Sequence, residues 1–230
     1  MPDKPPESPT DPPGPKDARI PEAEALDIWG PIVKVIVGDS DQIFYFHQGL
    51  LSSSSSFFRA AMKPEWDERR AETNTIDLRD TDPAIFRLYA HWAYFGTIPM
   101  PTEANASDTF VQLAHAYVLG EKLMSTKFKN TILDTFITSS MKFGFYPIGE
   151  PVAVMYEGTA ENSAGRRLLV EFCAYVAHGK EDSWMLEFEN CPKEFLVDVM
   201  KVMVKVRPAP TENPWPWLEE STQYHEKDSV

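Results

Sequence analysis

The chain has few cysteines and no long apolar run. Its 230 residues hold only Cys173 and Cys191, which excludes a disulfide framework and a zinc site with four cysteine ligands. No apolar run approaches the roughly 18 residues that a membrane-spanning helix requires. The N-terminus is rich in Pro and Asp without an apolar core, so a signal peptide is not expected. We therefore expect a cytoplasmic or nuclear protein.

Basic residues are also scarce. Twenty-two Lys and Arg stand against 35 Asp and Glu, which gives a formal net charge of −13. A surface that binds phosphates needs a surplus of positive charge, so nucleic acid and anionic membranes are not the expected partners. We interpret the acidity as a source of solubility.

Catalytic and metal-binding motifs are missing as well. None of the five histidines stands in an H-E-x-x-H pair or at zinc-finger spacing from a cysteine. Gly38-Asp-Ser40-Asp lacks the closing glycine of a nucleophile elbow. There is no Walker loop and no G-x-G-x-x-G fingerprint. The sequence thus predicts a protein without enzymatic activity, cofactor or metal.

Both ends of the chain have the composition of tails. Residues 1–20 are dominated by Pro, Asp, Lys and Glu, and residues 207–230 combine four prolines with a charged end. Such segments have too little apolar surface to fold alone, and we expect both to be disordered. Trp215 and Trp217 are the exception in the second tail. They either fold back onto the body or belong to a short linear motif.

Between the tails, strands come early and helices late. Residues 32–46 read as a hairpin around Gly38-Asp-Ser-Asp41, and 74–78 as a short strand. Asp82-Pro83 begins a helix that ends at Gly96. Further helices are expected from a cap at Asp108, over 128–137, over 168–179 and over 195–206. Ser54 or Ser55 should cap a short helix at 55–62. The pattern is α+β.

Several linked features resemble the BTB/POZ domain, most closely the form abundant in filamentous fungi. They cover residues 28–139 and are Val-x-Val-Gly38, Phe46-His47 with Leu50-Leu51, Ser55-x-Phe57-Phe58, Asp82-Pro83-x-x-Phe86 and Trp92-x-Tyr94-x-Gly96. The resemblance implies a small three-stranded sheet capped by helices. Residues 145–206 then resemble the helical extension that often follows such domains. This extension either completes the core or serves a partner interface.

The resemblance also implies a function in protein–protein interaction. Many members are substrate adaptors of cullin-type ubiquitin ligases, with a hydrophobic-x-Glu motif before the third strand. Trp66-Asp67-Glu68 falls at that place, and a tryptophan beside a carboxylate suits docking. The alternative is that Trp66 packs on the body. Phe86, Tyr89 and Tyr94 complete the predicted partner-binding set, as structural support. The other function left open is a self-associating scaffold without a link to ubiquitin ligases.

Two positions depart from the family pattern. Gly30-Pro31 and Gln48 stand where dimeric transcriptional members carry a charged pair, so a corepressor pocket is not expected. Ahead of Ile32, only Ile20–Trp29 is available for the N-terminal strand and helix that such members exchange. We therefore do not expect a domain-swapped dimer, and the chain is either a monomer or a dimer of another kind.

Overall fold

The computed structural model describes residues 19–22, 25–26, 28–63, 74–101, 105–178, 182–207 and 223. Its elements follow in the order β1 (Ile32–Val37), β2 (Gln42–His47), α1 (Gln48–Ser54), α2 (Ser56–Ala61), β3 (Thr75–Leu78), α4 (Pro83–Phe95), α5 (Ala106–Lys122), α6 (Thr126–Phe143), α7 (Glu150–Gly158), α8 (Ala164–Val176), α9 (Asp182–Phe188) and α10 (Lys193–Val206). Strands precede most of the helices, so the predicted α+β class is confirmed.

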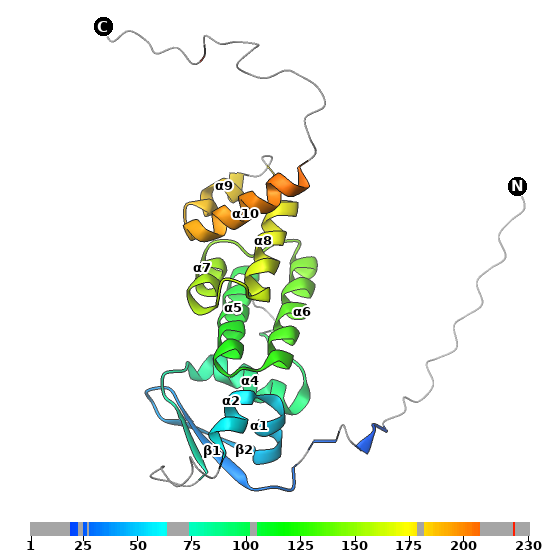
Figure 1. The fold of residues 1–230 in the computed structure, drawn as a ribbon, viewed down its shortest axis with the longest axis vertical. Coiled ribbons are helices and arrows are strands. Elements are labelled where there is room, and N and C mark those ends of the chain that lie inside the picture. Colours follow the sequence, from blue (N-terminus) through cyan, green and yellow to red (C-terminus); the bar gives the residue numbers. More distant parts are fainter. Residues whose placement is uncertain are drawn as a thin grey trace, which may run out of the picture.

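The sheet has three strands in the order β2-β1-β3 (Figure 1). The β1–β2 hairpin is antiparallel, with Ile36 opposite Ile43, and β3 lies parallel to β1. Side chains alternate across a strand, so Val33, Val35 and Val37 point into the core and are fully buried. The predicted hairpin and third strand are both present.

The molecule is elongated, with the sheet at one end and α10 at the other (Figure 1). Helices α1, α2 and α4 lie next to the sheet, and α5 and α6 run from there toward α7 and α8. One continuous hydrophobic core extends from Val33 in β1 to Val199 in α10. The helices after residue 144 therefore share the core of the preceding domain.

Local signals explain where the helices of this body begin and end. Ser55 caps α2, because its side chain accepts a hydrogen bond from the Phe58 amide, as predicted. Asp82 caps α4 in the same way, with Pro83 in the first turn, and α4 ends at Gly96. Gly96 has φ of 69°, a left-handed conformation that glycine adopts without steric cost.

The predicted cap at Asp108 is wrong. Asn105 caps α5, and its side-chain oxygen accepts a hydrogen bond from the Asp108 amide at 2.8 Å. The helix therefore starts three residues earlier than expected, and the Asp108 carboxylate lies in the first turn, where the helix dipole favours negative charge. Either residue type can cap a helix, so composition alone did not separate them.

Helix α8 begins at Ala164 rather than near Leu168, since Ser163 caps it and accepts from the Arg166 amide. The sequence patterns also missed α7 and α9 as separate helices. Both are short, and their apolar residues form too few helical turns to give a clear periodicity.

Among the residues described, no helix is long and apolar enough to cross a membrane.

Candidate partner interface

The predicted partner-binding residues occupy different environments. Trp66, Asp67 and Glu68 lie outside the described residues, in the segment between α2 and β3. Phe86 and Tyr89 in α4 have no exposed area, and Tyr94 is half-buried. A partner protein cannot reach Phe86 or Tyr89 in this structure, so their position fits the supporting role and not direct contact.

Tyr89 connects α4 to the junction of α1 and α2. Its hydroxyl lies 2.7 Å from Ser54 Oγ, and Ser54 Oγ donates to the Leu51 carbonyl. The Tyr89 hydroxyl is therefore the donor to Ser54. Its ring packs 6.0 Å from that of Phe58. Burial raises the pKa of Tyr89 well above its usual value, so the phenol stays protonated and keeps this bond at any physiological pH.

Phe86 and Tyr94 hold the hairpin on α4. The Phe86 ring meets Phe44 edge-on at 4.9 Å, and the Tyr94 ring stacks on Phe46 at 5.9 Å. The Tyr94 hydroxyl lies 3.2 Å from Nδ1 of His47, at the end of β2. Aromatic pairs of this kind add about 0.5–1.5 kcal/mol each beyond the area they bury. Together they fix β2 against α4.

A pair of serine contacts connects α2 to the turn between α5 and α6. Ser55 Oγ donates to the Leu123 carbonyl at 2.5 Å, in addition to its role as a helix cap. Ser125 Oγ donates to the Ser54 carbonyl at 2.6 Å. Ser55 and Ser125 are buried, so both bonds are shielded from water. Two segments about 70 residues apart thus form one surface, with a fixed relative position.

Three apolar side chains keep part of their surface exposed here, and we call them the α2 face: Phe57, Met62 and Met124. Phe57 and Met62 are half-buried, and Met124 is 53% exposed. Met124 has φ of 49° in the α5–α6 turn. Methionine side chains adapt to irregular contacts and are common on binding surfaces. Met62 lies two residues before the undescribed segment that holds Trp66.

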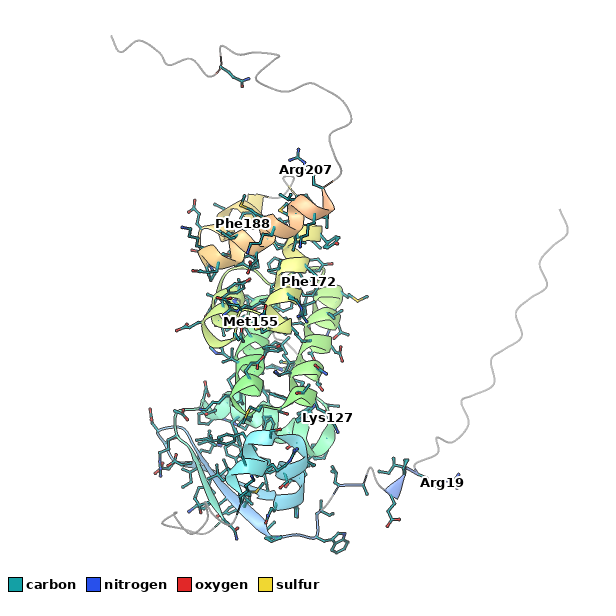
Figure 2. All side chains as sticks on the ribbon, in the orientation of Figure 1. Arg19, Lys127, Met155, Phe172, Phe188 and Arg207 are labelled. Carbon is teal, nitrogen blue, oxygen red and sulfur yellow. The ribbon has the colours of Figure 1, made fainter. Side chains whose placement is uncertain are left out.

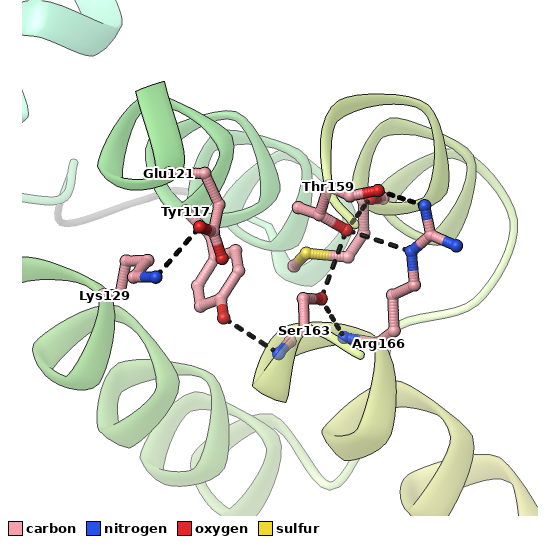
Figure 3. A network of polar contacts seen from close by, with 8 residues as sticks. Tyr117, Glu121, Lys129, Thr159, Ser163 and Arg166 are labelled. Atoms are coloured by element: carbon pink, nitrogen blue, oxygen red, sulfur yellow. Dashed lines mark hydrogen bonds and ion pairs between the residues drawn. The ribbon is translucent and has the colours of Figure 1, made fainter. Parts of the chain in front are cut away.

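A second set of polar contacts joins the domain to its extension (Figure 3). The Tyr117 hydroxyl in α5 accepts from the Gly165 amide of α8 at 3.1 Å. The Arg166 guanidinium donates from Nε to Thr159 Oγ1 at 3.0 Å and from its terminal nitrogen to the Tyr156 carbonyl at 2.6 Å. It also lies 4.4 Å above the Tyr156 ring. The end of α7, the start of α8 and α5 are thereby held together.

The sequence patterns did not single out this junction. The apolar periodicity around Tyr117 indicates a buried helical face, which gives no sign of what the Tyr117 hydroxyl contacts. Ser163 is of a residue type that commonly caps a helix. The contacts to Thr159 and Tyr156 come from a different helix, and no local pattern encodes them.

An open hollow of about 750 Å³ lies beside β2 and α1, lined by Gly30, Pro31, Gln48, Gly49, Ser52, Ser53 and Arg59. Arg59 is its one charged residue, and the guanidinium donates to the Ser52 carbonyl. The two positions predicted to lack a charged pair, Gly30-Pro31 and Gln48, both line it. The absence of a corepressor function stays a prediction.

Within the described ranges, no group of three or more His, Cys, Asp or Glu side chains is placed to hold a metal ion. Both cysteines are free thiols. Burial raises the pKa of Cys173 to about 12, so this thiol is a poor nucleophile at neutral pH.

A short sheet with helices on one side, and an exposed apolar face, defines an α+β domain suited to holding another protein. Residues 33–133 match the family model of the BTB/POZ domain. The chain thus contains a BTB/POZ domain, and such domains are protein–protein interaction modules. The matched range lies within the predicted 28–139.

Comparison with solved structures finds the BTB domain of human gigaxonin at 12% identity and a TM-score of 0.34, covering 45% of this chain and 75% of that one. No curated protein sequence matches. The likeness to the fungal form stays a prediction.

Proposed function

We propose that this chain is a non-enzymatic adaptor that docks on a cullin-type scaffold through its BTB/POZ domain and holds a client for ubiquitination. In this proposal, residues 28–139 are the docking domain, 145–206 the extension, and 1–20 and 207–230 the tails. The observation that carries it is the BTB/POZ match together with a Trp-Asp-Glu sequence at residues 66–68. Localisation to the cytoplasm or nucleus belongs to the same proposal.

The place of this sequence in the chain, shortly after the end of α2, supports docking. The chain leaves α2 at Ala61 and returns to the sheet at Thr75, so Trp66 follows closely on Met62. An indole that enters an apolar pocket, with a carboxylate beside it that sets the register, is the usual composition of a binding hot spot. The α2 face would add apolar contacts around that centre.

A rigid base favours affinity. Binding costs less when the contact surface is already ordered, and the α2 face rests on the aromatic layer of Phe58 and Tyr89 and on the bond from Ser55 to the α5–α6 turn. In this reading Phe86, Tyr89 and Tyr94 contribute to docking from below the surface.

The test is a binding titration of the full chain with a purified cullin N-terminal domain, by biolayer interferometry. Trp66→Ala combined with Glu68→Ala should weaken binding by about 30-fold or more, because hot-spot residues typically contribute at least 2 kcal/mol. A matched control is Trp29→Ala with Glu157→Ala, which removes an indole that is 93% exposed and an exposed carboxylate of α7, neither of which belongs to the α2 face. The control should bind like the wild type.

Two outcomes would contradict the proposal. Unchanged binding by the Trp66/Glu68 variant would show that the docking site is elsewhere. Failure of the wild-type chain to bind any cullin scaffold would remove the ubiquitin ligase link.

The second candidate, a self-associating scaffold, is favoured by another exposed apolar surface. Ile43 and Tyr45 on the outer side of β2 are 46% and 63% exposed, and Ile32 in β1 is 47% exposed. Contiguous apolar surface of this kind often marks an interface. Light scattering on the full chain separates the candidates: a stable oligomer without cullin affinity supports the scaffold.

A further inference from the structure

Helix α10 carries an apolar stripe that the described residues leave uncovered. Val197, Met200 and Val204 are 42%, 65% and 75% exposed. Their spacing of three and four residues places them on one side of the helix. We call this stripe the outer α10 face. It lies at the end of the molecule opposite the sheet (Figures 1 and 2).

The opposite side of the same helix is already packed. Phe195 and Val199 are buried, and Val202 is packed against the core. The polar residues Glu194, Asp198, Lys201 and Lys205 fall within a sector of about 60°, since each residue advances about 100° around the axis, and Lys193 lies on the side of the outer α10 face in the first turn. A helix that is apolar over most of its circumference belongs in an environment with partners on two sides. The described structure supplies one of them.

We propose that the second partner is the chain's own segment Pro214-Trp215-Pro216-Trp217-Leu218, which binds the outer α10 face. This segment lies outside the described residues. Only seven residues, 207–213, separate it from the end of α10. The inference is independent of the proposed adaptor function.

The length of the connection allows this contact. Residues 207–213 can span about 23 Å when extended, whereas Val197 lies only about 14 Å along the helix axis from Val206. The segment can therefore turn back and reach the whole outer face. Because it is tethered, its effective concentration at that face is on the order of millimolar, so weak contacts suffice.

Composition and charge favour this occupant over an unrelated partner. Two indoles and a leucine supply the large apolar area that a stripe of Val and Met can bury. Alternating prolines restrict the segment before binding, which lowers the entropic cost of docking. Residues 208–230 hold five carboxylates and one lysine, and the carboxylates of Glu219 and Glu220 would lie near Lys205 and near Lys201, whose ammonium also pairs with Asp198 at 2.9 Å.

The experiment uses the full chain labelled with 5-fluorotryptophan and ¹⁹F NMR. Single Trp→Phe substitutions assign the resonances of Trp215 and Trp217, and a soluble gadolinium chelate measures how accessible each indole is. Trp29, which is 93% exposed, and Trp92, which is 8% exposed, are internal references for the two limits. We expect the chelate to broaden the ¹⁹F resonances of Trp215 and Trp217 about threefold less, or weaker still, than that of Trp29. This is the result expected if the tethered segment is bound to the outer α10 face most of the time.

Met200→Asp combined with Val204→Asp should raise the broadening of both indoles to the level of Trp29. These side chains are exposed, so the packed side of α10 and the circular dichroism spectrum should not change. The control is Met141→Asp on α6, at a side chain that is 76% exposed. It introduces one aspartate at an exposed apolar position on another helix and should leave both indoles protected.

A complementary variant leaves the folded body intact. Trp215→Ser with Trp217→Ser should accelerate amide exchange in the last two turns of α10, whereas the same experiment on Trp29→Ser should not. Exposed indoles in the wild-type chain would overturn the proposal, as would protection that persists in the Met200/Val204 variant. Protection that disappears on 20-fold dilution would overturn it too, since the occupant would then be a second copy of the chain.

Discussion

At the scale of single residues, hydroxyl groups in the BTB/POZ domain fix positions that apolar packing leaves open. Ser55 both caps α2 and donates to the Leu123 carbonyl, and Tyr89 donates to Ser54. Apolar contacts are not directional, so they allow α2 to slide or rotate on the core. Buried hydrogen bonds have one good geometry each. These two residues therefore decide how the α2 face is presented.

Tyr89→Phe should reduce the free energy of unfolding by about 1 kcal/mol, the net value of a typical hydrogen bond. The cost stays small because Ser54 Oγ keeps its bond to the Leu51 carbonyl and no buried donor is left unpaired. Urea denaturation followed by fluorescence measures the change. Tyr175→Phe, at a residue that is 69% exposed, should have no effect. A loss as large as that expected for Tyr89→Ala, about 3–5 kcal/mol, would contradict this account.

At the scale of elements, capping residues and polar contacts between helices set where each helix starts and how it meets its neighbour. The Asp82-Pro83 start and the Gly96 end of α4 were predicted from the sequence, because both signals act on the adjacent backbone. The start of α5 was not predicted correctly, because Asn105 and Asp108 lie three residues apart and both are of a type that can cap a helix. At α7 and α8 the decisive contact is Arg166, which bridges two helices.

Arg166→Met should destabilise the protein by about 1–3 kcal/mol, because it removes hydrogen bonds from a charged donor to the Tyr156 and Thr159 carbonyls while keeping a long aliphatic chain. Thermal or urea unfolding measures the loss. Arg167→Met is the matched control, because Arg167 is the next residue along α8 and is exposed. Equal effects of the two substitutions would show that the bridge contributes nothing specific.

At the scale of the whole molecule, the extension and the BTB/POZ domain are parts of one packed unit. A single hydrophobic core joins them, and helix α8 approaches α5 closely at Gly165. A side chain placed on Gly165 would have its Cβ 2.8 Å from the Tyr117 ring and 2.6 Å from the Met155 sulfur. Met155 can move, but the Tyr117 ring is held by its own bond to the Gly165 amide.

Gly165→Ala should therefore destabilise the protein by about 1–3 kcal/mol, the usual cost of overpacking, although alanine is the better helix former by about 1 kcal/mol. Calorimetry should show one unfolding transition for the wild type, and a broader or divided one for the variant. Gly30→Ala is the control, because a Cβ there meets nothing within 4 Å. A more stable Gly165→Ala protein would mean that the helices separate readily and that the extension is a loosely attached unit.

The sequence by itself determined the parts of this protein that depend on neighbouring residues. Alternating valines and a Gly-Asp turn specify the hairpin, and helix caps with apolar periodicity specify most of the helices, because these preferences act over a few residues. The linked motifs were enough to identify the BTB/POZ domain. They also placed Phe86, Tyr89 and Tyr94 in the predicted partner-binding set as structural support, which stays a prediction, without showing what each side chain touches.

Only the tertiary structure decided which residues from distant parts of the chain come together. The bond from Ser55 to Leu123, the contact of Tyr117 with Gly165 and the uncovered stripe on α10 join or separate segments far apart in sequence. A side chain's exposure and partners depend on the packing of the whole core, and a local pattern of residues does not contain that information.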